Sequence, residues 1–247
     1  MKIFVVSLLH STERRERVSQ IFKMSGYHFE FFDAVNGKDG LPPRLAEKVN
    51  DKYRTIYRSR PLSAGEKGCF ASHYLLWEKC LQLNESIVIL EDDFSPTEHF
   101  CDAIDNIDLL IADLDYLRLE KRSCKWVTKD EVAGFERRFL FDNSCGTTGY
   151  VLTPQGASKL LSKSDQWLCA VDNYISENYI HNMHSFNLSP PAITALHDMG
   201  TYIQLEPKQR VPIYFKLTRE LNRFYRFVCS SISNQRFANQ LKKDKHL

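Results

Sequence analysis

The chain has 247 residues, of which 43% are hydrophobic, and a formal net charge of +2 at pH 7. This length is long for one domain and short for two independent ones, and the composition allows a full hydrophobic core. The small net charge creates no global field that would favour nucleic acid as a partner.

Strand and helix patterns alternate along most of the chain. The predicted strands cover residues 3–8, 28–32, 87–90, 115–119, 139–141 and 148–152. The predicted helices cover residues 12–24, 41–49, 63–83, 96–112, 155–161 and 171–181. Among them, Ser63 and Glu66 have the spacing of a capping box and predict the start of a long helix. Elements of this length in this order indicate an α/β fold with a single Rossmann-like, mainly parallel sheet flanked by helices.

A short β-branched apolar run at residues 87–90 stops at three consecutive carboxylates, Glu91, Asp92 and Asp93. Burial of this run as a strand places the acids at its carboxyl end, where open α/β sheets bind their ligands. A divalent cation would turn the repulsion among three neighbouring negative charges into binding. A solvated turn or a helix N-cap is the alternative that the acids alone leave open.

The cysteines and the apolar segments indicate the compartment. Seven cysteines are scattered without a C-x-x-C pair, which favours reduced thiols in a cytosol over a disulfide framework or a zinc site. The apolar N-terminal segment is followed directly by charged residues, so we interpret it as the first buried strand rather than a signal peptide. No stretch approaches the roughly 18 apolar residues that a membrane span needs.

The C-terminal residues have a charge and a pattern of their own. From Lys208 onward, ten basic residues face two acidic ones, a net charge of +8 that leaves −6 for the preceding body. An apolar stripe recurs at helical spacing at Leu217, Leu221, Phe224 and Val228. Arginines repeat that spacing on the opposite side of the helix at Arg219, Arg223 and Arg226. We therefore predict a globular domain over residues 1–205 and a basic amphipathic tail over residues 206–247, which lies on an anionic membrane surface or docks on the body.

Several short blocks occur in an order that is specific as a combination. They are S-T-E-R-R at residues 11–15, F-D-A-V-N-G at 32–37, L-S-A-G-E-K-G-C-F-A-S-H at 62–73, I-L-E-D-D at 89–93, G-T-T-G-Y-V-L at 146–152 with G-A at 156–157, and V-D at 171–172. Over roughly residues 1–200 the chain thus resembles glycosyltransferase family 25. This is the lipooligosaccharide galactosyltransferase type of Gram-negative bacteria, whose catalytic domain is shared with the collagen galactosyltransferases.

The resemblance implies a GT-A fold, UDP-galactose as a nucleotide-sugar donor, and transfer with inversion to a hydroxyl of a growing glycan. Mn²⁺ or Mg²⁺ bridging the donor phosphates would stabilise the leaving group, and acidic side chains at a strand edge supply the oxygen ligands that these hard cations take. We assign Asp93 as the main metal ligand and Glu91 as a second ligand, directly or through water. If strand geometry persists, Asp92 points to the opposite face and holds the loop or contacts ribose.

Two further residues are candidates for the chemistry of transfer. Asp172, at the start of a predicted helix, is our candidate for the base that accepts the proton of the acceptor hydroxyl; its alternative is an N-cap. Glu177 ranks below it because it lies off the Asp172 face. His197 is a candidate third metal ligand, with a surface histidine beside Asp198 as the commoner explanation.

Other positions are candidates for contact with the donor. Arg14 is placed for the diphosphate, and the alternative is an exposed helix charge. Asp33 and Asn36, next to Gly37, fit either uridine contact or turn chemistry. His73 could reach the donor or could only pack the helix.

The resemblance also implies where the protein works. A lipid-linked core oligosaccharide is made at the cytoplasmic face of the inner membrane, so we expect a cytoplasmic protein that is peripheral there through its tail. Two other classes stay open. A Mg²⁺-dependent phosphatase or phosphotransferase would need a nucleophilic Asp with a partner Lys or Thr that we do not find, and a non-catalytic glycan-binding protein could keep the same fold.

Overall fold

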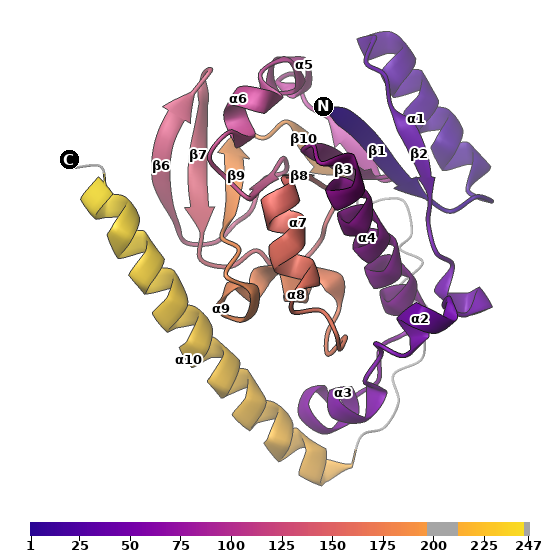
Figure 1. Ribbon diagram of the computed structural model, residues 1–247, viewed down its shortest axis with the longest axis vertical. Coiled ribbons are helices and arrows are strands. Elements are labelled where there is room, and N and C mark those ends of the chain that lie inside the picture. The colour runs from indigo at the N-terminus through magenta and orange to yellow at the C-terminus, as the bar shows by residue number, and fades with distance from the viewer. Residues whose placement is uncertain (197–211, 245–247) are drawn as a thin grey trace.

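The computed structural model describes residues 1–196 and 212–244, and its centre is one eight-stranded sheet (Figure 1). The strand order is β2-β1-β3-β8-β5-β9-β7-β6. The strands are β1 (Lys2–Ser7), β2 (Glu30–Asp33), β3 (Ile87–Glu91), β5 (Tyr116–Arg118), β6 (Trp126–Val132), β7 (Phe135–Leu140), β8 (Gly149–Leu152) and β9 (Ser185–Ser189). A separate pair joins β4 (Phe94–Pro96) to β10 (Ile193–Ala195).

Six of the eight strands of the described sheet run in one direction, and β8 and β7 run against them. This confirms the predicted α/β class with a mainly parallel sheet, although the two reversed strands make the sheet mixed. The run β2-β1-β3 is all parallel, so the carboxyl ends of β1 and β3 meet at one edge. The GT-A subtype stays a prediction.

Helices cover both faces of the sheet (Figure 1). On one face pack α4 (Ala64–Leu83), α7 (Pro154–Leu161) and α8 (Val171–Ser176). On the other pack α1 (Thr12–Ser25), α5 (Phe100–Asp105), α6 (Ile107–Ile111) and the end of α10 (Ile213–Asp244). The remaining helices are α2 (Pro43–Ala46), α3 (Asp51–Arg58) and α9 (Asn178–His181), with a 3₁₀ turn at Gly37–Asp39. The capping box predicted at the start of α4 is confirmed, because Ser63 and Glu66 exchange both hydrogen bonds.

Some predicted elements differ from the structure. The helix predicted over residues 96–112 is strand β4 followed by α5 and α6, because Asn106 leaves helical geometry with ψ at 10°. The helix predicted over residues 171–181 divides into α8 and α9 at Glu177, whose ψ of 57° is not helical. The helix predicted over residues 41–49 shrinks to α2. Strands β6, β9 and β10 were not predicted.

Helix α10 crosses the molecule along its outer edge, from α3 to the far end of the sheet (Figure 1). Its second half enters the core through Ala238 and Leu241. Its first half contacts α3 through polar groups, since Thr218 donates a hydrogen bond to the Ile56 carbonyl and Asn222 donates one to that of Tyr57. The predicted apolar stripe turns away from the body: Leu217, Leu221 and Phe224 are 66%, 62% and 66% exposed.

Candidate active site

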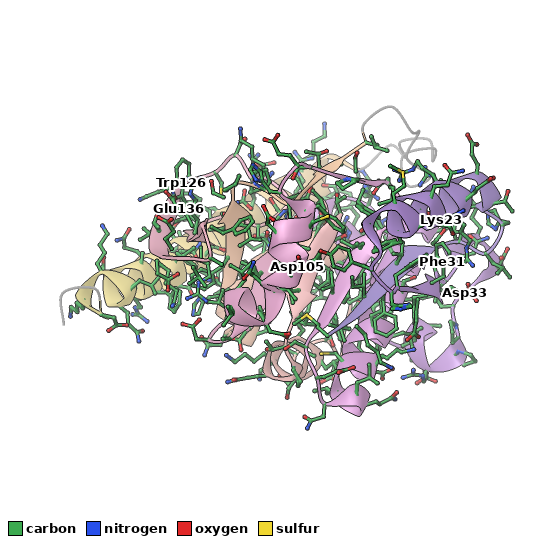
Figure 2. The ribbon with its side chains drawn as sticks, turned by 90° about the horizontal axis from the view of Figure 1, so that it is seen from above. Lys23, Phe31, Asp33, Asp105, Trp126 and Glu136 are labelled. Atoms are coloured by element: carbon green, nitrogen blue, oxygen red, sulfur yellow. The ribbon has the colours of Figure 1, made fainter. Side chains whose placement is uncertain are left out.

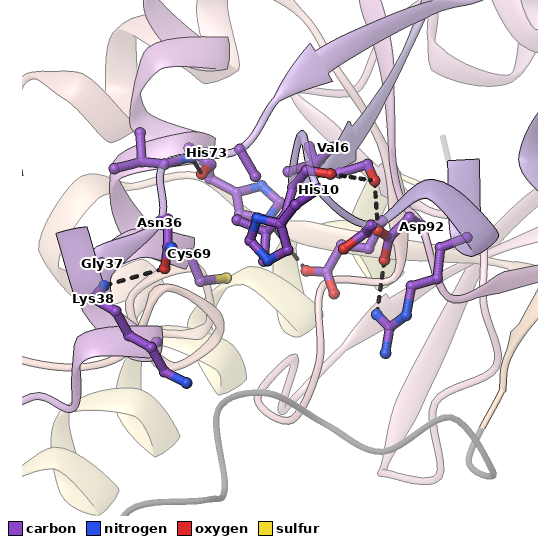
Figure 3. Close-up of a pocket in the computed structure, with 17 residues that line it drawn as sticks. Val6, His10, Asn36, Gly37, Lys38, Cys69, His73 and Asp92 are labelled. Carbon is purple, nitrogen blue, oxygen red and sulfur yellow. Dashed lines mark hydrogen bonds and ion pairs between the residues drawn. The ribbon is translucent and has the colours of Figure 1, made fainter. Parts of the chain in front are cut away.

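A cavity of about 210 Å³ opens at the carboxyl ends of β1 and β3. Its walls are the end of β1, the first turn of α1, the turn at residues 34–38 and one side of α4. Figure 3 shows His10 between this turn and Asp92. The site therefore lies at the sheet edge that the acidic motif predicted.

Two glycines let the 34–38 turn press against α4. A Cβ on Gly68 would lie 2.4 Å from the Val35 carbonyl oxygen, and one on Gly37 would lie 1.8 Å from that of Ala64. Ser72 strengthens the contact, because its Oγ accepts a 2.8 Å hydrogen bond from the Val35 backbone N–H. Two blocks that are separate in the sequence thus form one wall of the cavity.

Asp92 is buried at the base of the cavity and has all its charge partnered. The Ser7 hydroxyl donates to its Oδ2 at 2.6 Å, and Arg14 donates to its Oδ1 at 2.9 Å (Figure 3). Arg17 donates to the Asp92 backbone carbonyl at 2.6 Å. Asp92 therefore ties helix α1 to the end of β3 and sets the position of Arg14 on the cavity wall.

Glu91 is held by a chain of hydrogen bonds that starts in the core. Trp77 Nε1 donates to the Tyr150 hydroxyl at 3.0 Å, and that hydroxyl lies 2.8 Å from His73 Nδ1. A carboxylate only accepts hydrogen bonds, so His73 Nε2 donates to Glu91 at 3.2 Å, and the Tyr150 hydroxyl, which accepts from Trp77, can donate its own proton to His73 Nδ1. Burial raises the pKa of Glu91, but the hydrogen bonds from His73 and from the Thr147 hydroxyl hold it below its usual value.

Asp93 differs from both neighbours. Its Oδ1 is buried and has no hydrogen-bond partner among the described residues. Burial, followed by the charges of Glu91 and Asp92, raises the pKa of Asp93 to about 7. A buried carboxylate oxygen without a donor, next to two other carboxylates, fits an oxygen-ligated divalent cation.

A second set of metal-ligating atoms lies nearby. One ligand atom each of Cys69, His73 and Glu91 lies within 4.8 Å of the others. His73 and Glu91 already hydrogen bond to each other, and burial raises the pKa of the Cys69 thiol well above its ordinary value. Glu91 therefore belongs both to this trio and to the acidic motif.

Asp172 lies across one loop from Glu91. It is the second residue of α8 and not its N-cap, which is Ala170, so the capping alternative is wrong. The Asp172 Oδ2 accepts hydrogen bonds from the backbone N–H groups of Cys145 at 3.1 Å and Gly146 at 3.3 Å. The loop at residues 143–148 thus contacts Asp172 at one end and, through Thr147, Glu91 at the other.

Of the remaining predicted residues, some line the cavity and others lie outside it. Asn36 lines the cavity, and its Oδ1 accepts from the Lys38 backbone N–H at 3.2 Å (Figure 3). Asp33 does not line it, because its carboxylate pairs with Arg15 on the surface. His197 lies outside the described residues. Glu177, the alternative base, is buried between Arg58 and Arg226 and makes an ion pair with each.

Sequence reasoning missed several residues of this site. They are Ser7, His10, Lys38, Cys69, Thr147 and Tyr150. The only signal for Thr147 and Tyr150 was their place in the G-T-T-G-Y block. Their contacts with Glu91 and His73 follow from the insertion of antiparallel β8 beside β3, which the sequence pattern does not encode.

Comparison with known proteins places these features in one family. The model described as glycosyltransferase family 25 (LPS biosynthesis protein) matches residues 1–175. A glycosyltransferase 25 family member of Aedes aegypti is 32% identical over 75% of this chain and 33% of its own length. Procollagen galactosyltransferase 1-B of Xenopus laevis is 29% identical over 81% of this chain and 36% of its own length. The chain therefore spans about a third of these two relatives.

A relative of similar length matches this chain over most of its own length. Lipooligosaccharide biosynthesis protein lic2B of Haemophilus influenzae is 28% identical over 88% of this chain and 86% of its own length. The crystal structure of A197 from STIV covers 86% of this chain with 12% identity and a TM-score of 0.40. The family model covers more than half of the chain and includes the cavity, the acidic motif and Asp172. The chain belongs to glycosyltransferase family 25.

Proposed function

We propose that the chain is a metal-dependent, inverting glycosyltransferase that moves a sugar from a nucleotide-sugar donor to a glycan acceptor. The observation that carries the proposal is the unpartnered buried oxygen of Asp93, the residue that directly follows Glu91 and Asp92 in the cavity wall. Membership of family 25 supports the same reaction class. The cavity offers an anchored cation, Arg14, and Asp93 beside its wall offers a carboxylate oxygen without a partner among the described residues, and a sugar diphosphate with a bound metal requires both groups.

The donor would occupy the cavity between α1 and the 34–38 turn. Arg14 and Lys38 line it and carry positive charge toward the diphosphate, while Asn36 offers an amide for the nucleoside. Asp92 acts in this proposal by holding Arg14 and contacts the donor ribose beside it. His73 orients Glu91 from the floor. Asp33 has no part in the proposal because it lies outside the cavity.

Asp93 and Glu91 would hold Mn²⁺ or Mg²⁺. When bound, the cation neutralises charge on the departing nucleotide diphosphate as a Lewis acid. The structural support lies in the donor set, because Asp93 keeps a free oxygen and Glu91 stays ionised through its contacts with His73 and Thr147.

Asp172 would take the proton of the acceptor hydroxyl in a single displacement. Two backbone N–H groups of the 143–148 loop fix its Oδ2, and its Oδ1 accepts from the Asn173 backbone N–H at 2.7 Å. These hydrogen bonds hold the carboxylate in one orientation, as a general base requires. The loop also contacts Glu91 through Thr147, which would place the acceptor hydroxyl next to the donor.

For the donor sugar and the acceptor, we propose galactose from UDP-galactose and a lipid-linked lipooligosaccharide core. The support is two of the relatives described above, which are a procollagen galactosyltransferase and a lipooligosaccharide biosynthesis protein. These names describe those proteins, and the chain matches only about a third of the first.

The first half of α10 would lie on an anionic membrane at the cytoplasmic face of the inner membrane. Its stripe of Leu217, Leu221 and Phe224 is exposed. Arg219 and Arg223 belong to the same N-terminal half of α10, on the side of the helix opposite the stripe. Arg226, the third arginine of the side opposite the stripe, pairs with buried Glu177 and so faces the body. In the described residues no helix is long and apolar enough to cross a membrane.

The reaction class is tested with a panel of UDP-galactose, UDP-glucose, UDP-N-acetylglucosamine and GDP-mannose, each with Mn²⁺ or with EDTA. We expect one UDP-sugar to raise the melting temperature and to release nucleotide only with metal. The Asp172→Asn variant should keep the thermal shift and lose transfer to a glycan acceptor. The absence of any response to all four donors would contradict the proposal.

Membrane binding is tested by co-sedimentation with vesicles rich in phosphatidylglycerol. Deletion of the tail is unsuitable because Ala238 and Leu241 belong to the core. A triple variant, Leu217→Ser, Leu221→Ser and Phe224→Ser, should lose most vesicle binding while its melting temperature stays unchanged. Exposed Leu109→Ser on α6 is the matched control, and equal binding by the triple variant and this control would refute the membrane proposal.

A further inference from the structure

A second cavity, of about 680 Å³, lies on the far part of the sheet. Its walls are the loop at residues 121–124, the end of β9 with the two following prolines, and side chains of β6 and β7. Figure 2 shows one of its lining residues, Trp126, beside Glu136 at the opposite end of the molecule from Phe31 and Asp33. No step of the proposed transfer uses this cavity.

The second cavity shares a sheet face with the candidate active site. Tyr150, whose hydroxyl contacts His73, pairs directly with Arg118 on β5, and Arg118 pairs with Asn187 on β9. Asn187 in turn pairs with Arg138 on β7. Directly opposed residues on neighbouring strands project from the same face, so one row of side chains leads from His73 to the second cavity.

One buried polar group in this cavity lacks a partner. Asn187 is 4% exposed and lines the cavity. Its amide nitrogen donates to the Leu188 carbonyl at 3.1 Å, but its Oδ1 has no hydrogen-bond partner in the described structure. A buried acceptor without a donor is costly, and a ligand hydroxyl would satisfy it.

The rest of the lining is cationic and aromatic. Lys121, Arg122 and Arg138 all line the cavity, and the guanidinium carbon of Arg138 lies 4.9 Å from the centre of the Trp126 ring. Arg138 uses only its Nε for Glu136, and within the described chain its two terminal nitrogens and the Lys121 ammonium make no hydrogen bond or ion pair. Trp126 is 48% exposed, whereas the other two tryptophans, Trp77 and Trp167, are fully buried.

We propose that this cavity binds an acidic sugar of the acceptor glycan, meaning a sugar ring that bears a carboxylate or a phosphate. The ring would lie against Trp126, its anion would meet Arg138 and Lys121, and one hydroxyl would donate to Asn187 Oδ1. The cavity is lined by β9, β7 and β6 and is centred about four strand spacings from β3, roughly 19 Å, so this sugar is not the one that reacts. The proposal rests on the glycosyltransferase function and adds the charge of its acceptor.

The test is a fluorescence titration of the full-length protein, in which Trp126 is the exposed reporter. The probes are glucuronate, glucose 6-phosphate and, as the neutral match, glucose. We expect a saturable change with at least one acidic sugar at a concentration about tenfold lower than with glucose, because a charge-assisted contact is lost in the neutral sugar. Which acid responds identifies the anion. Equal responses to all three sugars, or none, would overturn the proposal.

Variants tie the response to the cavity. Lys121→Gln and Arg138→Gln should each weaken the acidic sugar about threefold to tenfold, whereas exposed Lys163→Gln, which follows α7 and does not line the cavity, should not. Unchanged affinity in the Lys121→Gln/Arg138→Gln double variant would also overturn the site. UDP-galactose binding is measured in parallel by thermal shift: binding of donor without acidic sugar refutes this inference alone, and binding of acidic sugar without donor refutes only the transferase proposal.

Discussion

Buried charged groups are partnered differently at the two ends of the molecule. At the end formed by β1 and β3, Asp92 has a hydroxyl and a guanidinium as partners, whereas its neighbour Asp93 keeps a buried oxygen with none. An acid held without a partner costs stability, and a fold retains it where a ligand will complete it.

Where α10 docks, the buried charges are paired. Glu177 lies between Arg58 and Arg226, and Arg137 on β7 lies between Asp113 and Asp130. Such ion pairs fix neighbouring elements to each other, here α3, α9 and α10. We therefore expect substitutions at the β1 and β3 end to change activity, and substitutions where α10 docks to change stability.

Replacing the unpartnered acid should have the largest effect. Asp93→Asn should lower metal-dependent transfer by roughly 10²–10⁴-fold, since a bound cation supplies several kcal/mol of transition-state stabilisation. The melting temperature without metal should not fall, because burial and the Glu91 and Asp92 charges already oppose ionisation of Asp93. Transfer rates and thermal unfolding with and without Mn²⁺ measure both. A large loss of stability with full activity would contradict the assignment of Asp93 to a ligand-binding role.

Removing the acid at the α10 contact should do the reverse. Glu177→Gln leaves the guanidinium groups of Arg58 and Arg226 without their buried counter-charge, which we expect to cost about 3 kcal/mol of unfolding free energy. Urea denaturation gives the value, and kcat should stay near that of the natural protein. Glu220→Gln, which removes an exposed pair with Arg219, is the control and should cost less than about 1 kcal/mol.

Acid should weaken the same docking region. Burial lowers the pKa of His181 to about 4 and that of His184, which stacks on Phe237 of α10, also to about 4. Both folded-state values lie below the ordinary 6.5, so the unfolded chain binds protons first. Stability is therefore full above pH 6.5 and falls as the pH drops toward 4, by about 3 kcal/mol for His181.

Urea denaturation between pH 7.5 and pH 4.5 checks this slope. His181→Gln should flatten it in part, with His184 supplying the remainder. His28→Gln, at an exposed position, should leave it unchanged. If the slope is the same in all three proteins, these histidines do not set it.

The smallest effect is expected at the wall of the first cavity. A methyl group on Gly68 would meet backbone atoms of Val35 at 2.4 Å and Gly37 at 2.6 Å, so Gly68→Ala must push the 34–38 turn away from α4. Overpacking of this kind costs about 1–3 kcal/mol, and we expect it to raise the donor KM more than it lowers kcat. Gln82→Ala on the exposed side of α4 is the control. An unchanged KM would show that the turn does not shape the donor site.

The sequence predicted the first end of the molecule better than the second. The apolar run before Glu91 and the capping box at Ser63 are local signals, and both elements formed where expected. Strand β6 was missed because its centre, with Lys129, Asp130 and Glu131, reads as a charged loop and is a strand only through pairing with β7. That pairing is a long-range property that no local pattern reports.

The site shows the same division. Asp92 and Asp93 are adjacent and chemically identical, and only the positions of Ser7 and Arg14 decide that one is partnered and the other is not. Asp33 looked equally suited to a ligand, but Arg15 on α1 draws it to the surface. The stripe on α10 was predicted as an amphipathic pattern, while the direction it faces depends on α3.

The hydrogen-bond chain that ends at Glu91 in the candidate active site begins at a residue of the hydrophobic core, Trp77. Trp77 is fully buried, and phenylalanine would keep an aromatic ring at this position but leave part of its volume empty. Phenylalanine offers no N–H, so the Tyr150 hydroxyl would lose the donor that orients it toward His73, the residue that holds Glu91. Selection on transfer would therefore retain tryptophan for its N–H, and selection on folding would retain it for its volume.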